Sequence, residues 1–395
     1  MLTSTPFTRG STVVITPAET GHRIQRLRIA NGLNQAQLAA ATMIPTGGVS
    51  MVEHGRQGLD EATLERVADA LGCTANYLTR SQGQPTSTRP WLRAYADASK
   101  KAVDRYVADT ETAIEAFDAL RLRPIPETLP YFDDDGNDED AIEDFAGEVR
   151  HAAGLEDGDV VGNCIRRTER LGVLVLPMHD ELGRHMGLSQ RVNATPVIRV
   201  SRPHFAEDGT VSPSGDRQRF TVAHELGHLT LHATTPPPAT AEQARLVEQQ
   251  AHRFAGAFLA PADPLLADLD QLGGRVTLTT VAELKKTWGV SIKMLVVRFR
   301  QLGRIDDQHA RSLYKQISAR KWNKAEPVAV GHEHAIWLTK ALNRAGLDST
   351  TAAAALGLAP RYLQDWQAWD LQSPPSADLP AGVVPISRKR QAAAR

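Results

Sequence analysis

Apolar residues recur at helical spacing along most of the chain. Residues 21–80 contain several short runs with this period, and residues 91–123 form one longer amphipathic pattern that ends before a proline. The period resumes near Ile142 and continues from Phe220 to Asp370. Apolar positions three to four residues apart are typical of helices that bury one face. The pattern therefore predicts a mainly helical chain.

Two short segments differ from this helical pattern. Residues 173–177 (VLVLP) and 196–201 (PVIRVS) are rich in branched apolar side chains. Short runs of this composition favour β-strands, because branched side chains pack well on a pleated surface. The fold class that we expect is therefore mostly α with a small β-sheet, an α+β chain.

The bulk composition excludes several classes of protein. At 395 residues the chain is long enough for two or three domains, and 42% hydrophobic and 23% charged residues are ordinary for globular protein. Its two cysteines, Cys73 and Cys164, can build neither a disulfide framework nor a cysteine-based zinc site. No stretch is apolar for long enough to cross a bilayer, and the first residues do not form a signal peptide. We expect a cytoplasmic protein with no membrane partner.

The net charge of −1 conceals two strongly charged regions. Residues 133–144 hold eight acidic residues and no basic one, which is typical of a solvated linker. Residues 281–325 hold eleven Lys and Arg against three acidic residues. This basic region is either a surface that faces phosphates or a solvated helical face, and charge alone does not separate the two.

The N-terminal region has the sequence signals of several short helices. Asn34 can cap a helix over 35–42, a turn at 43–45 follows, and a third run at 46–54 ends at Gly55. Short helices in this succession are typical of a helix-turn-helix, whose third helix enters the major groove of DNA. Further short helices are expected at 23–31, 61–71 and 76–78.

This region resembles the XRE/Cro-type repressor family. The resemblance runs from NQAQLAAATMIPTGGVSMVEHGRQG to LERVADALGCTANYL. It implies that double-stranded DNA is a partner, that the third helix reads bases through Thr46, Ser50 and Met51, and that Gln35 and Arg56 contact the DNA backbone.

Two features of the same region depart from the family. Gly47 and Gly48 stand where base-reading side chains are usual, and residues 1–80 carry only seven Arg and Lys against six acidic residues. A small excess of positive charge gives weak attraction to phosphates. A small helical module for protein interaction or dimerisation is therefore the alternative interpretation.

The segment RFTVAHELGHLTLH, residues 219–232, carries the most specific chemical motif in the chain. His224 and His228 are four residues apart, so on an α-helix they lie on one face and can bind one cation. Glu225 projects about 100° away from His224, which suits a base that acts on a water molecule. This is the H-E-x-x-H arrangement of two zinc ligands with a catalytic glutamate between them.

A catalytic zinc ion needs a third protein ligand and an open position for water. Glu248 lies on the next predicted helix, twenty residues beyond His228, a separation that permits the chain to return antiparallel. His232 and His252 are the rival third ligands. Each can instead form a hydrogen bond to one of the metal-binding side chains, on the side that faces away from the metal. We favour Glu248, because His232 follows His228 on one continuous helix and is poorly placed to complete a tetrahedron.

Residues 140–325 resemble the ImmA/IrrE family of metallo-endopeptidases. The resemblance is carried by the HELGH helix and by the later segment EQQAHRFAGAFLAP. It implies zinc bound by both histidines and by Glu248, and it implies cleavage of a protein substrate, a repressor in particular. Gln250 and His252 depart from the residues usual in the family. An intact motif can also bind zinc without hydrolysis, so a structural or ligand-sensing zinc domain remains the alternative.

Two later segments, residues 279–305 and residues 350–366, show the same sequence pattern of a helix, a short turn and a second helix. The first is either a second nucleic-acid contact or a helical hairpin that packs on the peptidase. Three residues that precede the HELGH motif, Arg217, Arg219 and His204, are expected at the surface.

Three functions are consistent with the sequence: a DNA-binding regulator that cuts a partner repressor with zinc, a transcription factor whose zinc domain does not hydrolyse, and an antitoxin or antirepressor that acts by protein contact alone. A homodimer is a further option. The predicted domains are a helix-turn-helix domain at 21–80, a helical and acidic linker region at 81–139, a zincin-like zinc metallopeptidase domain at 140–275, a basic helix-turn-helix-like segment at 276–325, a C-terminal helical segment at 326–372 and a disordered tail at 373–395.

Overall fold

The computed structural model divides the chain into two compact units, each described here by itself. Unit 1 comprises Met1–Thr86, Asp104–Arg121 and Leu347–Leu363, and unit 2 comprises the remainder. The predicted tail and the start of the helix predicted at 91–123 lie outside the described residues, which are 17–371 without 82, 89, 91–99, 134–137, 180–184, 206–208 and 237.

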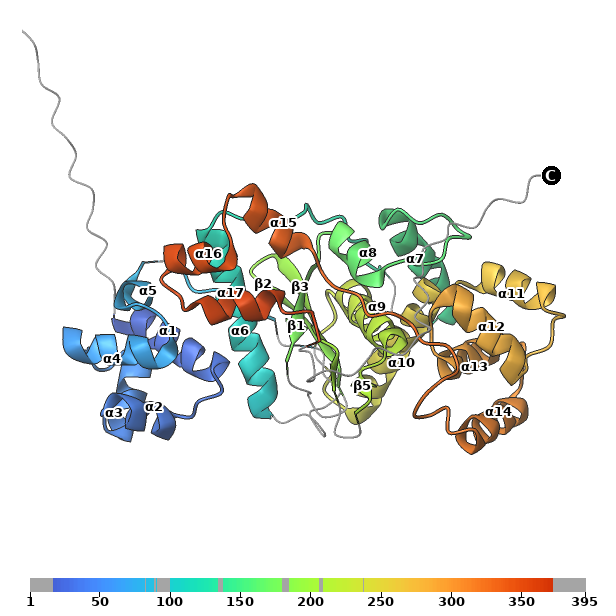
Figure 1. Cartoon of the computed structure of the whole chain (residues 1–395), viewed down its shortest axis with the longest axis horizontal. Coiled ribbons are helices and arrows are strands. Elements are labelled where there is room, and N and C mark those ends of the chain that lie inside the picture. Colours follow the sequence, from blue (N-terminus) through green and yellow to red (C-terminus); the bar gives the residue numbers. More distant parts are fainter. Residues whose placement is uncertain are drawn as a thin grey trace, which may run out of the picture. The chain divides into compact units, whose positions relative to one another are not determined.

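Unit 1 contains the predicted N-terminal helices (Figure 1). The second predicted helix has the expected bounds, and Asn34 caps it through a reciprocal capping box with Gln37. Ile24, Leu27 and Val49 are buried between the helices. The helices are α1 (Pro17–Ala30), α2 (Gln35–Thr42), α3 (Thr46–Glu53), α4 (Glu61–Leu71) and α5 (Ala75–Thr79).

Unit 1 also contains three helical segments from elsewhere in the chain: most of α6 (Lys100–Ala119), α16 (Ser349–Leu356) and the first residues of α17 (Pro360–Gln367). The predicted linker region and the predicted C-terminal segment are therefore each divided between the two units. A charged cluster holds α6 against α1 and α5. Glu115 of α6 accepts from Arg23 Nε at 3.2 Å and from Arg80 Nη2 at 2.8 Å, and it also pairs with Arg26.

Unit 2 contains a small mixed sheet. The predicted strands β1 (Leu174–Met178) and β3 (Thr195–Ser201) pair in parallel, and β2 (Gly187–Val192) pairs antiparallel to β3, in the order β1-β3-β2. A two-stranded sheet of β4 (His204–Phe205) and β5 (Val211–Ser212) follows. The described residues thus confirm the predicted α+β class, although β2, β4 and β5 were not predicted.

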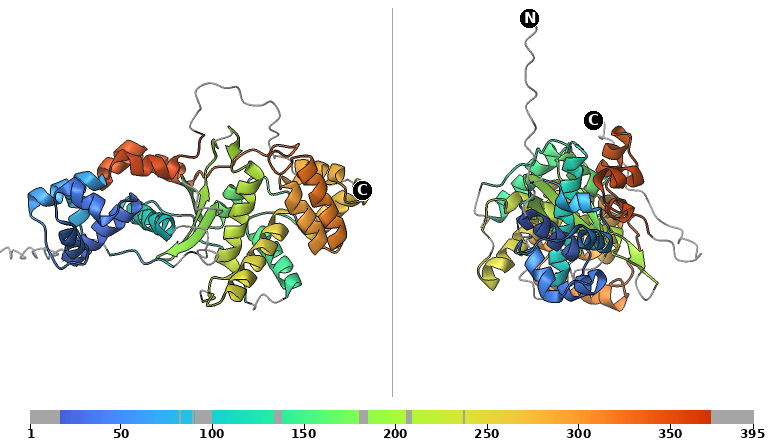
Figure 2. Two further views of the ribbon diagram at one scale, coloured as in Figure 1. Left: turned by 90° about the horizontal axis from the view of Figure 1, so that it is seen from below. Right: turned by 90° about the vertical axis from the view of Figure 1, so that its left-hand side faces the viewer.

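Two long helices follow the strands, α9 (Gly215–Leu231) and α10 (Ala241–Leu259). α9 packs on β2 and β3, and α10 packs on α9 (Figures 1 and 2). Gly227 makes the close approach of the two helices possible, since a Cβ atom there would lie 2.9 Å from Phe254 and 3.4 Å from Ala251. The other helices of unit 2 are α7 (Glu139–Ala152), α8 (Cys164–Arg170), α11 (Ala262–Gln271), α12 (Leu278–Trp288), α13 (Ile292–Gln301), α14 (Asp307–Ala319) and α15 (Trp337–Arg344).

The basic region at 281–325 is only partly a solvated face. Lys285 of α12 is buried and pairs with Asp216 at the start of α9, and its Nζ also lies 2.7 Å from Glu326. Arg298 of α13 is buried as well and pairs with Glu143 of α7. For these two residues the expectation of a solvated or phosphate-facing surface is wrong, because each guanidinium or ammonium group neutralises a carboxylate inside unit 2. No helix among the described residues is long and apolar enough to span a membrane.

Candidate metal centre and DNA-reading helix

Helix α9 presents the two motif histidines on one face. The Nε2 atoms of His224 and His228 lie 3.1 Å apart, and the two rings meet edge to face with centroids 4.6 Å apart. His228 is completely buried, whereas the side chain of His224 is 13% exposed. One ring therefore anchors the pair inside the unit, and the other borders solvent.

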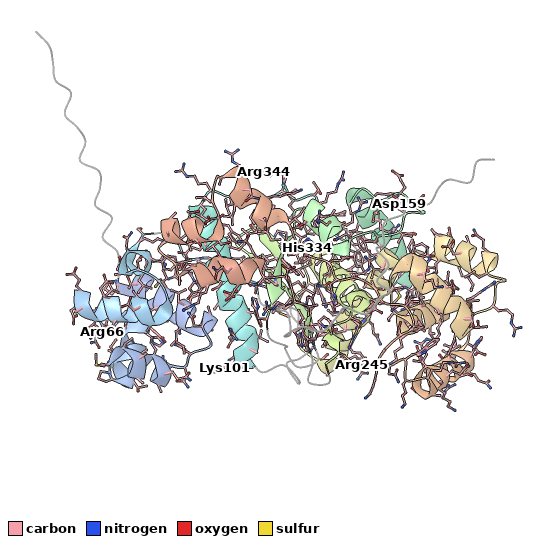
Figure 3. The ribbon with its side chains drawn as sticks, in the orientation of Figure 1. Arg66, Lys101, Asp159, Arg245, His334 and Arg344 are labelled. Atoms are coloured by element: carbon pink, nitrogen blue, oxygen red, sulfur yellow. The ribbon has the colours of Figure 1, made fainter. Side chains whose placement is uncertain are left out.

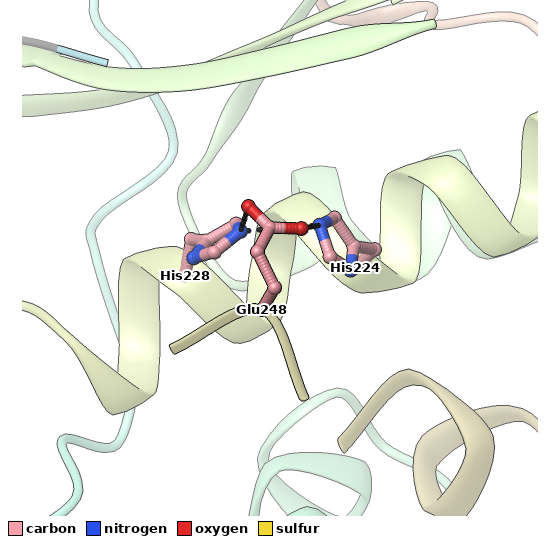
Figure 4. Close-up of side chains that lie close together, drawn as sticks. All are labelled: His224, His228 and Glu248. Carbon is pink, nitrogen blue, oxygen red and sulfur yellow. Dashed lines mark hydrogen bonds and ion pairs between the residues drawn. The ribbon is translucent and has the colours of Figure 1, made fainter. Parts of the chain in front are cut away.

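Helix α10 brings a carboxylate to the same point. The oxygens of Glu248 lie 3.5 Å from His224 Nε2 and 3.7 Å from His228 Nε2. Figure 4 shows the carboxylate between the two imidazoles. The close packing at Gly227 is what allows α10 to reach this position. Among the described residues, these three side chains form a group whose ligand atoms all lie within 4.8 Å of one another.

The geometry of this group fits a tetrahedral dication. Zinc bonds to nitrogen of about 2.0–2.1 Å imply ligand atoms roughly 3.3 Å apart in a tetrahedron. The two Nε2 atoms are 3.1 Å apart, and each lies 3.5 or 3.7 Å from its nearer Glu248 oxygen, Oε2 for His224 and Oε1 for His228, so a small turn of the carboxylate brings one oxygen to that distance from both. Two imidazoles and one carboxylate are also the donor set of known catalytic zinc sites with one open position.

The rival ligand His232 lies behind His228 and outside this group. Its Nδ1 is 3.1 Å from His228 Nδ1, and its Nε2 is 2.9 Å from Gln250 Oε1. Because an amide oxygen only accepts, His232 Nε2 carries the proton, and His232 Nδ1 then accepts from His228 Nδ1–H. This relay leaves the lone pair of His228 Nε2 directed at the metal position. Gln250, noted as a departure from the family, thus supports one of the motif histidines.

The other rival, His252, stacks on His224. Their ring centroids are 4.6 Å apart, and Phe220 lies 5.4 Å from His252 on the other side. The buried Nδ1 of His224 has no hydrogen-bond partner among the described residues. His224 is therefore positioned by ring packing, in contrast to the hydrogen-bond relay behind His228.

Burial controls the protonation of the imidazoles. It lowers the pKa values of His224 and His228 well below the usual value, and the neighbouring histidines lower both further. Burial also lowers the pKa of His232 to about 4, against a smaller opposing effect of Gln250. The three rings are therefore neutral at physiological pH, which is the form that binds a metal ion.

Glu225 lies beside the same position on α9, almost fully buried. Its Oε2 accepts a hydrogen bond of 2.7 Å from Ser189 Oγ of β2. Gly187 of β2 leaves room for the side chain, since a Cβ there would lie 3.0 Å from Glu225 Cγ. Burial raises the pKa of Glu225 to about 8, the Ser189 hydrogen bond lowers it and nearby Glu248 raises it. Sequence reasoning missed Ser189, because β2 itself was not predicted.

These groups line a cleft of about 830 Å³ in unit 2. His224, Glu225 and Glu248 lie in it, and its walls include apolar side chains. Three exposed cations also line the cleft: Arg217 of α9, Arg245 of α10 (labelled in Figure 3) and Lys293 of α13. None of these three forms an ion pair within the described part of the chain.

The expectation that Arg219 is a surface residue is wrong. Arg219 is buried, pairs with Glu333 and donates to the carbonyls of Val161 and Gly162. Arg217 is exposed, as expected, and His204 is partly exposed. Arg219 therefore fixes the start of α9 in the unit and does not reach the cleft.

The predicted DNA-contacting residues lie on and around α3. Thr46 and Met51 are exposed, Ser50 is partly exposed, and Arg56 is exposed just after the helix. Gln35 is partly buried and its amide donates to Glu53 Oε2 at 2.7 Å, so one of its two amide hydrogens remains for a phosphate.

Comparison with known families matches two separate segments of the chain, the N-terminal helices and the domain that holds the candidate metal centre. A family model described as helix-turn-helix matches residues 24–78, and the model of peptidase family M78, described as an IrrE N-terminal-like domain, matches residues 168–300. One segment of the chain is thus similar to each of these two families. The predicted fusion is confirmed, with a region of DNA-binding type followed by a metallopeptidase-like domain. Searches of curated proteins and of solved structures found no match.

Proposed function

We propose that this fusion is a cytoplasmic DNA-binding transcriptional regulator whose IrrE-like domain is a zinc-dependent endopeptidase that cleaves a partner repressor. The observation that carries the proposal is the convergence of His224, His228 and Glu248 on one point, with Glu225 beside them in an open cleft. A purely structural metal site is normally closed by four protein ligands. A three-ligand set that borders a cleft favours catalysis.

His224, His228 and Glu248 would hold the zinc ion. When bound, zinc polarises a carbonyl group and lowers the pKa of water. Glu225 is then the general base: its carboxylate takes a proton from the attacking water and delivers it to the leaving amine. Ser189 holds one carboxylate oxygen, so that the other can face the water.

Within the described part of unit 2, the edge of β2 that faces away from β3 is paired at its Arg191 end and unpaired at its Gly187 end, which offers a place for the substrate backbone. Ser201 N donates to Met186 O, and Thr88 pairs with Arg191 on the opposite edge. Because peptide groups alternate between the two edges of a strand, those of Gly187 and Ser189 point away from β3, on the Thr88 side. An extended peptide that paired with this edge would lie along the cleft, close to Glu225.

Cleavage of a candidate repressor tests the proposal. Repressors encoded nearby would be incubated with the wild-type chain and with Glu225→Gln, each with and without a zinc chelator. The proposal predicts fragments with the zinc-loaded wild type alone. Fragments that persist with the chelator, or with Glu225→Gln, would assign the cleavage to another activity.

The raised pKa of Glu225 predicts how zinc affinity depends on pH. Below about pH 8 the metal-free chain holds a proton on Glu225, and a bound dication expels it. The affinity should therefore rise with pH, by at most about tenfold per pH unit, and level off near pH 8. Competition with a chelator from pH 6 to 9 measures this rise. In Glu225→Gln the zinc affinity should depend little on pH. An equal pH dependence in both proteins would show that the proton released on zinc binding comes from the imidazoles and not from Glu225.

The cations of the cleft predict a preference for acidic substrates. Arg245→Glu with Lys293→Glu should lower kcat/KM for a peptide with acidic residues by roughly two- to fivefold per charge, and raise it for a basic peptide. Lys315→Glu, an exposed reversal on α14 outside the cleft, is the control. If the control changed kcat/KM by the same factor per charge, the net charge of the protein, and not the cations of the cleft, would set the preference for acidic peptides.

The exposed Arg56 predicts a phosphate contact. Arg56→Ala should weaken DNA binding equally for all sequences and reduce the slope of log affinity against log salt by about one. Arg56→Lys keeps the charge and should keep the slope. Titrations at several salt concentrations measure it, and a loss confined to one DNA sequence would point to a base contact.

A further inference from the structure

Two segments of unit 1, 285 positions apart, have similar sequences. Residues 68–78 read ADALGCTANYL and residues 353–363 read AAALGLAPRYL, with six of eleven aligned positions identical. The identical pairs are Ala68/Ala353, Ala70/Ala355, Leu71/Leu356, Gly72/Gly357, Tyr77/Tyr362 and Leu78/Leu363. In four of these six identical pairs, all except Ala70/Ala355 and Gly72/Gly357, both residues are buried.

The two segments also have the same local structure. Each is the end of a helix, a glycine at positive φ and the start of a second helix, with φ of 72° at Gly72 and 75° at Gly357. The residue after each glycine donates to the equivalent carbonyl: Cys73 N to Ala68 O, and Leu358 N to Ala353 O, both at 2.9 Å. The second segment therefore has the fold of the α4–α5 corner.

The two corners pair with each other through reciprocal hydrogen bonds. Thr74 N donates to Gly357 O, and Ala359 N donates to Gly72 O, both at 2.8 Å. In the alignment Thr74 corresponds to Ala359 and Gly72 to Gly357, so exchanging the segments converts each bond into the other. Cys73 and Leu358 lie opposite each other at the centre of this antiparallel bridge. The contact is a local two-fold contact within one chain.

A two-fold contact uses the same surface on both partners. A corner that pairs with a near-copy of itself can therefore pair, by the same bonds, with the corner of a second chain. We propose that residues 353–363 are an internal copy of the α4–α5 corner that occupies its self-association surface. The helix-turn-helix region is then kept from dimerising through this surface.

Further contacts fix the copy to unit 1 and distinguish it from its counterpart. Tyr362 Oη donates to Leu71 O at 2.7 Å, and Asn31 Nδ2 donates to Tyr362 Oη at 2.6 Å. Among the described residues, the equivalent Tyr77 Oη does not make the matching bond to Leu356 O, and its ring instead lies 4.2 Å from the guanidinium of Arg80. These unequal contacts favour the internal copy over a second chain.

The proposal changes how the region would read DNA. Dimeric helix-turn-helix proteins read two half-sites about one helical turn apart. A region whose pairing surface is occupied from within presents one α3 helix for each chain. It should therefore protect a single half-site and bind without dependence on a palindrome.

An engineered cross-link tests the pairing in the full-length chain. Residues that face each other between such hydrogen bonds have Cα atoms about 4.5 Å apart, within reach of a disulfide. Leu358→Cys should therefore form a disulfide with Cys73 on mild oxidation, and the chain should stay monomeric on a non-reducing gel. Leu358→Ser is the control. Disulfide-linked dimers, or thiols that stay free, would overturn the proposal.

A second pair of variants tests whether the covered surface associates. Leu356→Asp with Tyr362→Asp should displace the copy, so that sedimentation shows a concentration-dependent dimer where the wild type is monomeric. Gly357→Ala is the milder variant, because its Cβ would lie 2.4 Å from Thr74 Oγ1. Helical content shows whether the variants stay folded, and failure of the Leu358→Cys cross-link in their background shows that the copy is displaced. If the variants are folded and displaced but still monomeric, the surface does not self-associate and the proposal fails.

Discussion

Replacing Glu225 by Gln should reduce peptide cleavage by roughly 10²- to 10⁴-fold, the range that positioned general acid–base groups contribute. Glutamine has the same shape and can still accept the hydrogen bond from Ser189 Oγ. It cannot take a proton from water at neutral pH. Zinc content should stay at the wild-type level, because Glu225 is not in the group formed by His224, His228 and Glu248. Single-turnover cleavage and metal analysis of the same sample measure both effects.

Two matched variants separate the loss of the base from other causes. Ser189→Ala keeps the carboxylate and removes one hydrogen bond, so it should cost about tenfold or less. Glu248→Gln should instead lose zinc and activity together. If Glu225→Gln retained wild-type cleavage with zinc bound, the hydrolytic role of this residue would be wrong.

Replacing Glu115 by Ala should destabilise unit 1 by about 3–5 kcal/mol, the cost of removing one partner from a buried ionic network. Its carboxylate is the shared partner of Arg23, Arg26 and Arg80. Burial already lowers the pKa values of these three guanidinium groups, and without Glu115 they would lose the one carboxylate that they share. Denaturant unfolding followed by far-UV circular dichroism measures the change, and DNA binding should weaken in parallel.

Asp118→Ala is the control on the same helix. Its side chain is exposed, so the expected change is within about 0.5 kcal/mol. If the two variants lowered the free energy of unfolding equally, the loss would reflect a general effect of substitutions in α6. The charged cluster around Glu115 would then not be what holds α6 in unit 1.

Much of the fold could be predicted from local signals in the sequence. The cap at Asn34 and the branched residues of β1 and β3 act within a few positions, so pattern and propensity were enough. The spacing of His224 and His228 likewise follows from one helical turn. What places Glu248 beside them is the packing of α10 on α9 at Gly227, which no single segment determines.

The features that the sequence did not reveal depend on distant partners. β2 contains Gly, Ser, Gln and Arg, which favour strands weakly, and its pairing with β3 determines its structure. This is why Ser189 was missed. Arg219 was assigned to the surface because its partner Glu333 lies 114 positions away. The docking of α6 on the N-terminal helices depends in the same way on Glu115, which looks like an ordinary acidic residue in the sequence.

Anomalous diffraction at the zinc edge, from crystals grown with zinc, tests the central claim most directly. The account predicts a peak about 2.0–2.2 Å from His224 Nε2, His228 Nε2 and a Glu248 oxygen, with a fourth position open to the cleft beside Glu225. A peak coordinated by other residues, a fourth protein ligand in the open position, or no peak at these three side chains would contradict it.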